Sequence, residues 1–305
     1  MRRPFETGKT WRALAPSPPA VWTIESVLRW AADDFRARGI ESPRLDAELL
    51  LGLALGATRI QLITDAKREL NEGDLARFRE LVKRRRAREP VAYILGQREF
   101  YGRPFRVDRR VLVPRPDTEA LVDEALERSR AVSMSMRALD LCTGSGCVAI
   151  TMARERPTSC VVASDVSDDA LTVARDNALR LGAYNVALRR GDLFAAVDEA
   201  WRFDVVTANA PYIAPHEIGE LQPEIRDHEP RGALVADEGG LAITRRIVES
   251  AATHLARGGV LAVEVGFGQA AAVRAIFERA RFVDVRVRRD QARIDRVVSG
   301  VTRIP

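Results

Sequence analysis

The chain has 305 residues, of which 46% are hydrophobic and 30% are charged. This is the composition of a soluble globular protein, long enough for one large domain or for a small and a larger one. The formal charge of +5 is modest, so it permits acidic or ribosome-associated partners without requiring them. No apolar run reaches the length of a membrane span, and the basic N-terminal stretch lacks the apolar core of a signal peptide. We therefore expect a cytoplasmic protein with no membrane partner.

The cysteines and histidines do not indicate a metal site. The three cysteines form no CxxC pair, so we expect reduced thiols in a cytosolic protein. The three histidines lack the spacing of metal ligands, and we expect structural or surface roles for them. The six residues are Cys142, Cys147, Cys160, His216, His228 and His254.

The N-terminal third of the chain has a helical pattern. Residues 1–20 end in "APSPPA" and are expected to form a flexible tail. Residues 21–89 contain no strand-like alternation and predict a small helical bundle. Thr23 suits the N-cap of its first helix, with Glu25 in the first turn and Gly39 at the stop.

A short linker is predicted to follow the bundle. Pro90 ends the helical pattern, and residues 90–115 alternate short apolar pairs with turn residues such as Gly102. This pattern is typical of a β-hairpin. Asp117 or Thr118 is placed to cap the next helix.

Residues 116–305 alternate strand-like and helical segments. This βαβ rhythm predicts a mostly parallel, doubly wound α/β sheet. The last two strand candidates lie close together, which predicts an antiparallel hairpin at one edge. The candidates are "ALDLC", "CVVASD", "VALRRGD", "FDVVTAN", "VLAVEVG", "FVDVRV" and "RVVSGV".

A glycine-containing loop follows the first of these strands in "LDLCTGSGCVAI". Gly144 and Gly146 permit a tight turn and close approach of a ligand, and the helix that begins near Cys147 offers its N-terminus. The next strand ends at Asp165, whose carboxylate can accept both hydroxyls of a ribose or can cap the following helix. The loop also satisfies the G-x-G-x-x-A pattern of dinucleotide sites, so it predicts a nucleotide-like ligand without identifying it.

The third and fourth strands end in further polar residues. In "GDLF", Asp192 and Leu193 are expected beside an adenine. In "NAPY", Asn209 lies at the carboxyl end of the fourth strand, where doubly wound sheets bind ligands. Its side-chain oxygen and the backbone carbonyl of Ala210 form a pair of acceptors that matches the two N–H bonds of a primary amide.

Pro211 restricts the backbone before it, and the ring of Tyr212 is placed to wall such a pocket. "NAPY" resembles the (N/D)PPY motif of amino methyltransferases that use S-adenosylmethionine. The wider set of motifs is similar to the protein-(glutamine-N5) methyltransferases that modify peptide-chain release factors. The matching segments occur in the family's order: "PVAYILGQREFYGRPFRVDRRVLVPRPDTEALV", "LDLCTGSGCVAI", "SDVSDDALTVARDNA", "GDLF", "NAPY", "RDHEPRGAL", "GGVLAVEVGFGQ" and "DRVVSG".

The resemblance implies a Rossmann-like class I methyltransferase sheet that binds S-adenosyl-L-methionine and methylates the glutamine of a GGQ motif. It implies release factors as protein substrates, docked by the helical N-terminal region, with no direct need for nucleic acid. We expect a monomer. The implied cofactor contacts are Cys142, Thr143, Gly144, Ser145, Gly146, Asp165, Asp192, Leu193 and Asn209. The implied catalytic and substrate-binding residues are Asn209, Ala210, Pro211 and Tyr212.

One position departs from the family pattern. The family has proline where this chain has Ala210, and alanine keeps the backbone carbonyl but explores more φ/ψ space. We expect activity with a modest loss of preorganisation.

Several alternatives stay open on the sequence. The enzyme could methylate glutamine in a ribosomal protein, or N6 of adenine in nucleic acid. It could bind the cofactor without catalysis, or use NAD, although no hydride-transfer site is evident. Two features have two interpretations each. The basic run Lys83–Arg88 is either a binding patch or a solvated helix face, and Glu119 either closes over the site or caps its helix.

Overall fold

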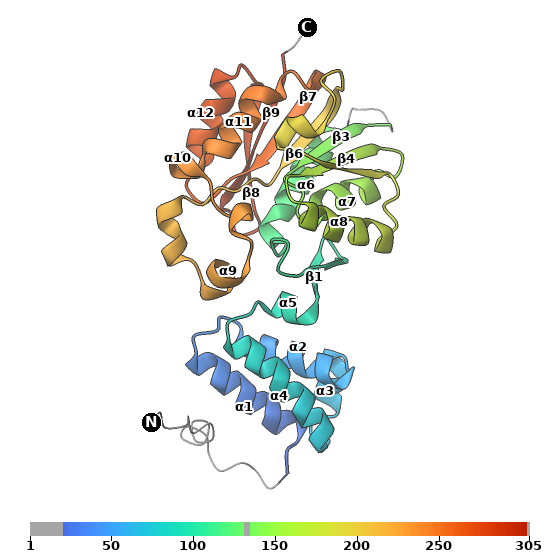
Figure 1. The fold of residues 1–305 in the computed structure, drawn as a ribbon, viewed down its shortest axis with the longest axis vertical. Helices are drawn as coiled ribbons and strands as arrows, with labels where there is room; N and C mark the ends of the chain where they lie inside the picture. The colour runs from blue at the N-terminus through green and yellow to red at the C-terminus, as the bar shows by residue number, and fades with distance from the viewer. Residues whose placement is uncertain (1–20, 131–134, 304–305) are drawn as a thin grey trace, which may run out of the picture. The chain divides into compact units, whose positions relative to one another are not determined.

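The computed structural model describes residues 21–130 and 135–303 (Figure 1). The expected tail at residues 1–20 lies outside the described residues. The chain divides into two compact units between Leu95 and Gly96, within the segment expected to be a linker.

The first unit is helical. Its helices are α1 (Ile24–Ala37), α2 (Pro43–Leu55), α3 (Arg59–Thr64), α4 (Glu72–Arg86) and α5 (Val91–Leu95). Thr23 caps α1 as predicted, because its side chain accepts a hydrogen bond from the Ser26 amide in a reciprocal capping box. Gly39 follows the end of α1 with a φ of 67°, the left-handed conformation that favours glycine at this position. The apolar faces of α1, α2 and α4 meet in a core that contains Phe35, Leu50 and Phe78.

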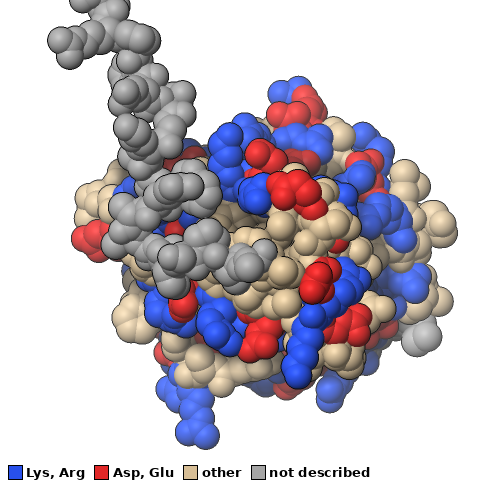
Figure 2. Space-filling model, turned by 90° about the horizontal axis from the view of Figure 1, so that it is seen from below, with Lys and Arg blue, Asp and Glu red and all other residues tan. Residues whose placement is uncertain are grey.

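Most arginines of the basic run Lys83–Arg88 form ion pairs within the helical unit. Arg85 is buried and its Nε donates to Asp46 Oδ2 at 2.7 Å. Arg86 forms an ion pair with Asp34 and lies 5.3 Å from the ring centre of Trp30. On the face seen in Figure 2, basic and acidic side chains alternate and form no field of one sign. The run is thus neither a plain solvated face nor an uncompensated patch.

The second unit is an α/β domain preceded by a hairpin. Its strands are β1 (Gln97–Phe100), β2 (Arg103–Arg106), β3 (Arg137–Leu141), β4 (Cys160–Asp165), β5 (Val186–Arg190), β6 (Phe203–Ala208), β7 (Leu255–Glu264), β8 (Val283–Arg289) and β9 (Asp295–Val301). Its α-helices are α6 (Glu119–Arg128), α7 (Cys147–Glu155), α8 (Asp168–Arg180), α9 (Pro223–His228), α10 (Asp237–Gly240), α11 (Ala242–Ala251) and α12 (Ala270–Arg279). Short 3₁₀ turns are η1 (Pro116–Thr118), η2 (Leu193–Ala196), η3 (Pro215–Glu220) and η4 (Arg231–Ala233).

The predicted hairpin is formed by β1 and β2, which pair antiparallel. Tyr101 and Gly102 connect them, both with positive φ, as the type I′ hairpin turn requires. Glu119 Oε1 accepts a hydrogen bond from the Tyr101 amide at 2.8 Å. The Glu119 carboxylate therefore holds the hairpin turn.

The predicted capping of the next helix is wrong. The turn η1 runs directly into α6, so Thr118 already has helical φ and ψ and makes no capping hydrogen bond. Asp117 instead forms an ion pair with Arg296 at 2.9 Å. The hydroxyl of Thr118 instead accepts a hydrogen bond from Asn209 Nδ2 at 3.2 Å.

The seven-stranded sheet has the order β5-β4-β3-β6-β7-β9-β8. Its first five strands in this order are parallel, and β9 and β8 form the predicted antiparallel hairpin at the edge. Every strand candidate of the sequence is found, although β7 begins five residues before the run that suggested it, at Leu255 rather than Val260. The prediction of a doubly wound α/β sheet is confirmed.

Two helical layers cover the sheet (Figure 1). Alternate strand residues enter opposite cores because side chains alternate across a strand. Leu139 and Val206 pack with α11 and α12 in one core. Ala138 and Val205 pack with α6 and α7 in the other.

The buried Arg85–Asp46 pair provides a stability prediction for the helical unit. Asp46→Ala leaves a buried guanidinium without its carboxylate, and we expect a loss of about 3 kcal/mol in the free energy of unfolding. Denaturant unfolding followed by tryptophan fluorescence measures it. Asp33→Ala is the matched control, because Asp33 and Arg36 form an ion pair with both side chains 64% exposed, and we expect less than about 1 kcal/mol there. Equal losses in both variants would contradict this assignment.

Candidate active site

The candidate site lies at the carboxyl edge of the parallel strands, where the strand order reverses between β3 and β6. Leu141 at the end of β3 is level with Ala208 at the end of β6. Leu141 is also level with Ser164 near the end of β4. The connections after β3 and β6 lead to opposite sides, which opens a crevice at this point of a doubly wound sheet.

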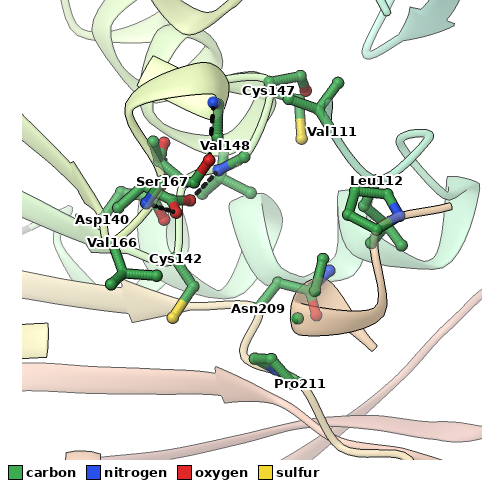
Figure 3. A pocket seen from close by; sticks show the side chains of 18 of the residues that line it. Val111, Leu112, Asp140, Cys142, Cys147, Val148, Val166, Ser167, Asn209 and Pro211 are labelled. Atoms are coloured by element: carbon green, nitrogen blue, oxygen red, sulfur yellow. Dashed lines mark hydrogen bonds between the residues drawn. The ribbon is translucent and has the colours of Figure 1, made fainter. Parts of the chain in front are cut away.

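A cavity of about 350 Å³ occupies the crevice (Figure 3). This is within the range of about 300–1,000 Å³ for small-molecule sites. Nine of the predicted site residues line it: Cys142, Thr143, Gly144, Ser145, Asp165, Asp192, Leu193, Asn209 and Pro211. Gly146, Ala210 and Tyr212 are not among the lining residues.

The loop after β3 has a constrained backbone. Cys142 has a φ of 56°, an unfavourable conformation for a residue with a side chain, and such strain is concentrated at functional sites. Gly146 has a φ of 81°, and a Cβ there would lie 2.8 Å from Ile150 Cδ1 and 3.3 Å from Ala174 Cβ. Glycine thus lets the loop turn and lets α7 and α8 pack closely. The predicted helix start at Cys147 is confirmed.

Asp140, in β3, anchors this loop, and the sequence did not lead us to predict a role for it. Its two side-chain oxygens accept hydrogen bonds from the hydroxyls of Thr143 at 2.6 Å and Thr207 at 2.8 Å. Burial raises the pKa of the Asp140 carboxyl to about 6, against the opposing effect of these bonds and of one from the Ala149 amide. An aspartate inside the apolar run "ALDLC" was the signal available in the sequence.

Asp165 lies across the loop at the end of β4. Its Oδ2 accepts the Gly144 amide at 2.9 Å, and its Oδ1 accepts the Ser167 amide at 3.0 Å. Each carboxylate oxygen has a further lone pair. The carboxylate is thus fixed in place and still able to accept two hydroxyls. Ser167, rather than Asp165, caps α8 by accepting a hydrogen bond from the Ala170 amide.

The wall after β5 is shaped by a glycine and a strained leucine. A Cβ at Gly191 would lie 2.6 Å from the backbone N and Cα of Ala196, so no side chain fits. Leu193 has a φ of 53° and is buried. The carboxylate of Asp192 accepts a hydrogen bond from Arg246 at 2.7 Å on the surface.

The segment after β6 contributes Asn209 and Pro211 to the cavity. Cys142 and Asn209, which follow neighbouring strands, both line it (Figure 3). Asn209 Nδ2 donates to Thr118 Oγ1 at 3.2 Å. Ala210 is 4% exposed and packs in the core. The Tyr212 carbonyl accepts a hydrogen bond from Gln269 Nε2 at 2.9 Å, and burial raises the pKa of the Tyr212 phenol to about 12.

Two further segments complete the cavity wall. Thr118 and Arg115 come from the "PRPDT" segment, and residues 230–235 include four lining residues. Arg115 donates to Glu229 Oε1 at 2.7 Å, and the Glu229 side chain is 1% exposed. This ion pair ties the two segments together. Neither segment was predicted to line the cavity.

Metal and thiol chemistry find no support at this site. In residues 21–130 and 135–303 no cluster of histidine, cysteine, aspartate and glutamate could hold a metal ion. The three cysteines are free thiols, as predicted. Burial raises the pKa values of Cys142 and Cys147, that of Cys147 to about 12, so both stay protonated at neutral pH.

Fold and site together define a class I methyltransferase: a doubly wound sheet with an antiparallel edge, a glycine loop after β3, an acidic residue after β4 and an asparagine after β6. A family model described as "PrmC N-terminal domain" matches residues 26–96, and one described as "Methyltransferase domain" matches residues 133–270. A methyltransferase domain of this class implies methylation that depends on S-adenosylmethionine.

Curated relatives show the family. A release factor glutamine methyltransferase of Geobacter sulfurreducens is 43% identical and covers 92% of this chain and 98% of its own. One of Caulobacter vibrioides is 39% identical and covers 92% of this chain and 97% of its own. This chain belongs to the release factor glutamine methyltransferase family. Among solved structures, the hMettl16 catalytic domain has a TM-score of 0.55 at 13% identity, covers 72% of this chain and 82% of its own, and supports the fold alone.

The helices that the structure describes include none that is both long and apolar enough to cross a membrane.

The two glycines Gly191 and Gly232 both line the cavity and give a matched test of its shape. Gly191→Ala forces the backbone of Ala196 to move, and we expect a loss of at least about 2 kcal/mol in the free energy of unfolding. A Cβ at Gly232 has open space around it, so Gly232→Ala is expected to change stability by less than about 0.5 kcal/mol. Thermal or denaturant unfolding of both variants checks this. If Gly191→Ala is as stable as Gly232→Ala, the backbone of Ala196 can move away from the added Cβ at little cost, and this prediction is wrong.

Proposed function

We propose that this protein transfers a methyl group from S-adenosylmethionine to the side-chain amide nitrogen of the GGQ glutamine in peptide-chain release factors. Its curated relatives are named for this activity. The observation that carries the proposal is the hydrogen bond from Asn209 Nδ2 to Thr118 at the edge of the cavity. It leaves Asn209 Oδ1 as the carboxamide atom that can accept an N–H from a substrate amide.

The cavity suits the cofactor. The loop Cys142–Gly146 has an unobstructed surface at Gly144, where a Cβ would meet nothing within 4 Å. Asp165 has acceptor capacity for two ribose hydroxyls, and Leu193 is placed to pack against a base. When bound, the cofactor supplies an electrophilic methyl group on a sulfonium sulfur.

Asn209 and Ala210 are proposed to orient the substrate amide. One N–H of the glutamine is accepted by Asn209 Oδ1 and the other by the backbone carbonyl of Ala210. An amide nitrogen is a poor nucleophile because its lone pair is delocalised into the carbonyl. Each hydrogen bond contributes about 1 kcal/mol net, so two of them cannot account for the rate enhancement of methyl transfer alone. Alignment can supply about 7–11 kcal/mol, so we assign most of the rate to it.

No general base is required early in this mechanism. Once methylated, the amide nitrogen is cationic and strongly acidic, so it loses its proton readily to water. Tyr212 is unsuited to be a base, because burial raises the pKa of its phenol to about 12. The residues of the motif therefore bind and orient, and the proton leaves afterwards.

The helical unit is proposed to dock the protein substrate. On α3, Ile60 and Ile63 are 74% and 67% exposed, and their i,i+3 spacing places them on one face of the helix. We further propose that the enzyme acts as a monomer.

Substrate choice is tested by three parallel incubations with labelled S-adenosylmethionine. Release factor, ribosomal protein and DNA are the acceptors, and mass spectrometry locates the label. We expect label on the GGQ glutamine of the release factor. Label on a ribosomal-protein glutamine or on adenine N6 would instead favour one of the two alternative substrates.

Asn209→Ala is expected to abolish methyl transfer, because the side-chain acceptor for the substrate amide is lost. Cofactor affinity should change by no more than about threefold, since Asn209 contributes one lining residue among many. Turnover with release factor and calorimetric titration with S-adenosylmethionine measure the two effects. Near-normal turnover in this variant would overturn the proposed role of Asn209.

Ala210→Pro restores the family residue and keeps the backbone carbonyl. Reduced backbone freedom contributes about 0.4–1 kcal/mol at compatible positions, so we expect turnover to rise by at most about fivefold. The measurement is kcat with release factor at saturating cofactor. A loss of activity would mean that the backbone at residue 210 differs from the one that proline requires.

A further inference from the structure

Two buried polar side chains lie behind Asn209. Thr118 is 1% exposed and Glu264 is 2% exposed. Glu264 is the last residue of β7, and the pairing of Ala208 with Val263 places it level with Asn209 on the neighbouring strand. Neither residue belongs to the motif from which the sequence predicted catalysis.

The three side chains form one chain of hydrogen bonds. Asn209 Nδ2 donates to Thr118 Oγ1 at 3.2 Å. The Thr118 hydroxyl is also a hydrogen-bonding neighbour of the Glu264 carboxylate, and this contact lowers the pKa of Glu264. Thr118 is free to do this because it makes no capping bond to α6.

The direction of these bonds is fixed by chemistry. An ionised carboxylate only accepts hydrogen bonds, and a hydroxyl has a single hydrogen to donate. With that hydrogen given to Glu264, Thr118 has only lone pairs to offer Asn209. The carboxamide of Asn209 must then turn its NH₂ group to Thr118 and its oxygen away.

Glu264 is held at an energetic cost, since a buried carboxylate needs compensating bonds. Its Oε2 has no hydrogen-bond partner among the described residues. The nearby Arg296 pairs with Asp117 and Asp290 rather than with Glu264. Of the groups that lower the pKa of this carboxyl, the Thr118 hydroxyl has the largest effect, ahead of Arg296 and Arg115.

We infer that Thr118, held by Glu264, is a positioning residue that sets the orientation of the Asn209 carboxamide, so that Oδ1 rather than Nδ2 faces the substrate. The inference rests on the proposed function, in which Oδ1 accepts an N–H of the glutamine amide. Reversed, the carboxamide would present NH₂ to NH₂ and repel the substrate.

The arrangement depends on the charge of Glu264. Burial raises the pKa of this carboxyl to about 7, and the Thr118 bond and Arg296 act in the opposite direction. The other charged or titratable groups around it are Asp117, Arg115 and Tyr212. Below about pH 7 the carboxyl becomes protonated and can donate, so Thr118 is no longer obliged to accept from Asn209.

The decisive comparison is between Thr118→Val and Thr118→Ser. Valine keeps the shape and removes the hydroxyl, while serine keeps the hydroxyl. We expect kcat to fall about tenfold or more in Thr118→Val, the effect of one well-placed hydrogen bond on a rate. Thr118→Ser should retain most of the activity, and affinity for S-adenosylmethionine should stay within about twofold in both variants. A folded Thr118→Val enzyme with wild-type turnover would overturn the inference.

Glu264→Gln provides a second test that does not depend on the stability of the valine variant. A glutamine side chain can donate or accept, so the orientation is no longer imposed. For the wild-type enzyme we expect kcat to decline as pH falls through about 7; for Glu264→Gln we expect lower turnover at pH 8 and no such decline. An unchanged profile would contradict the role of Glu264.

Asn209→Ala separates the two levels of the argument. If the wild-type enzyme places no label on release factor, the proposed function is wrong. If it does and Asn209→Ala is as active, the proposed role of Asn209 is wrong, and the positioning role of Thr118 falls with it. If Asn209→Ala is inactive while Thr118→Val turns over normally, the proposed function stands and only the positioning role fails.

Discussion

The parallel pairing of β3 with β6 is the constraint on which the site depends. It brings the loop after Leu141 and the segment after Ala208 to the same edge of the sheet. A shift of one residue would turn the buried side chains of either strand to the opposite face, so the two hydrophobic cores hold this register firmly. The glycine loop and Asn209 meet because the cores permit only this alignment.

A buried carboxylate lies behind the residues that line each side of the cavity. Asp140 holds the loop after β3 through Thr143, and Glu264 lies behind Asn209 through Thr118. Burial raises the pKa of both carboxyls, to about 6 and about 7. Both therefore oppose stability at neutral pH, because a raised carboxyl pKa favours the folded state only as the group becomes protonated. The fold retains two unfavourable groups beside residues that line the cavity.

Much of this structure could be read from local sequence patterns. The alternation of apolar runs predicted all seven strands of the large sheet, and "CTGSG" and "NAPY" located both walls of the cavity, because turn residues after a buried strand have few other uses. The prediction that Thr118 caps a helix was wrong. In the sequence, a threonine before a helical run looks the same whether it caps the helix or bonds to a distant side chain. Its partner Glu264 is 146 residues away by number, and no local pattern connects two such positions.

The alanine in "NAPY" shows how tertiary packing can replace local rigidity. Ala210 is held in the core, and Pro211 restricts the backbone that precedes it. Downstream, Gln269 holds the Tyr212 carbonyl, and a Cβ at Gly240 would lie 1.9 Å from that oxygen, so only glycine allows this close approach. These contacts therefore fix the backbone at residue 210 and just after it. Because these contacts leave little backbone freedom for a proline to remove, the family residue is not needed to keep the Ala210 carbonyl in place.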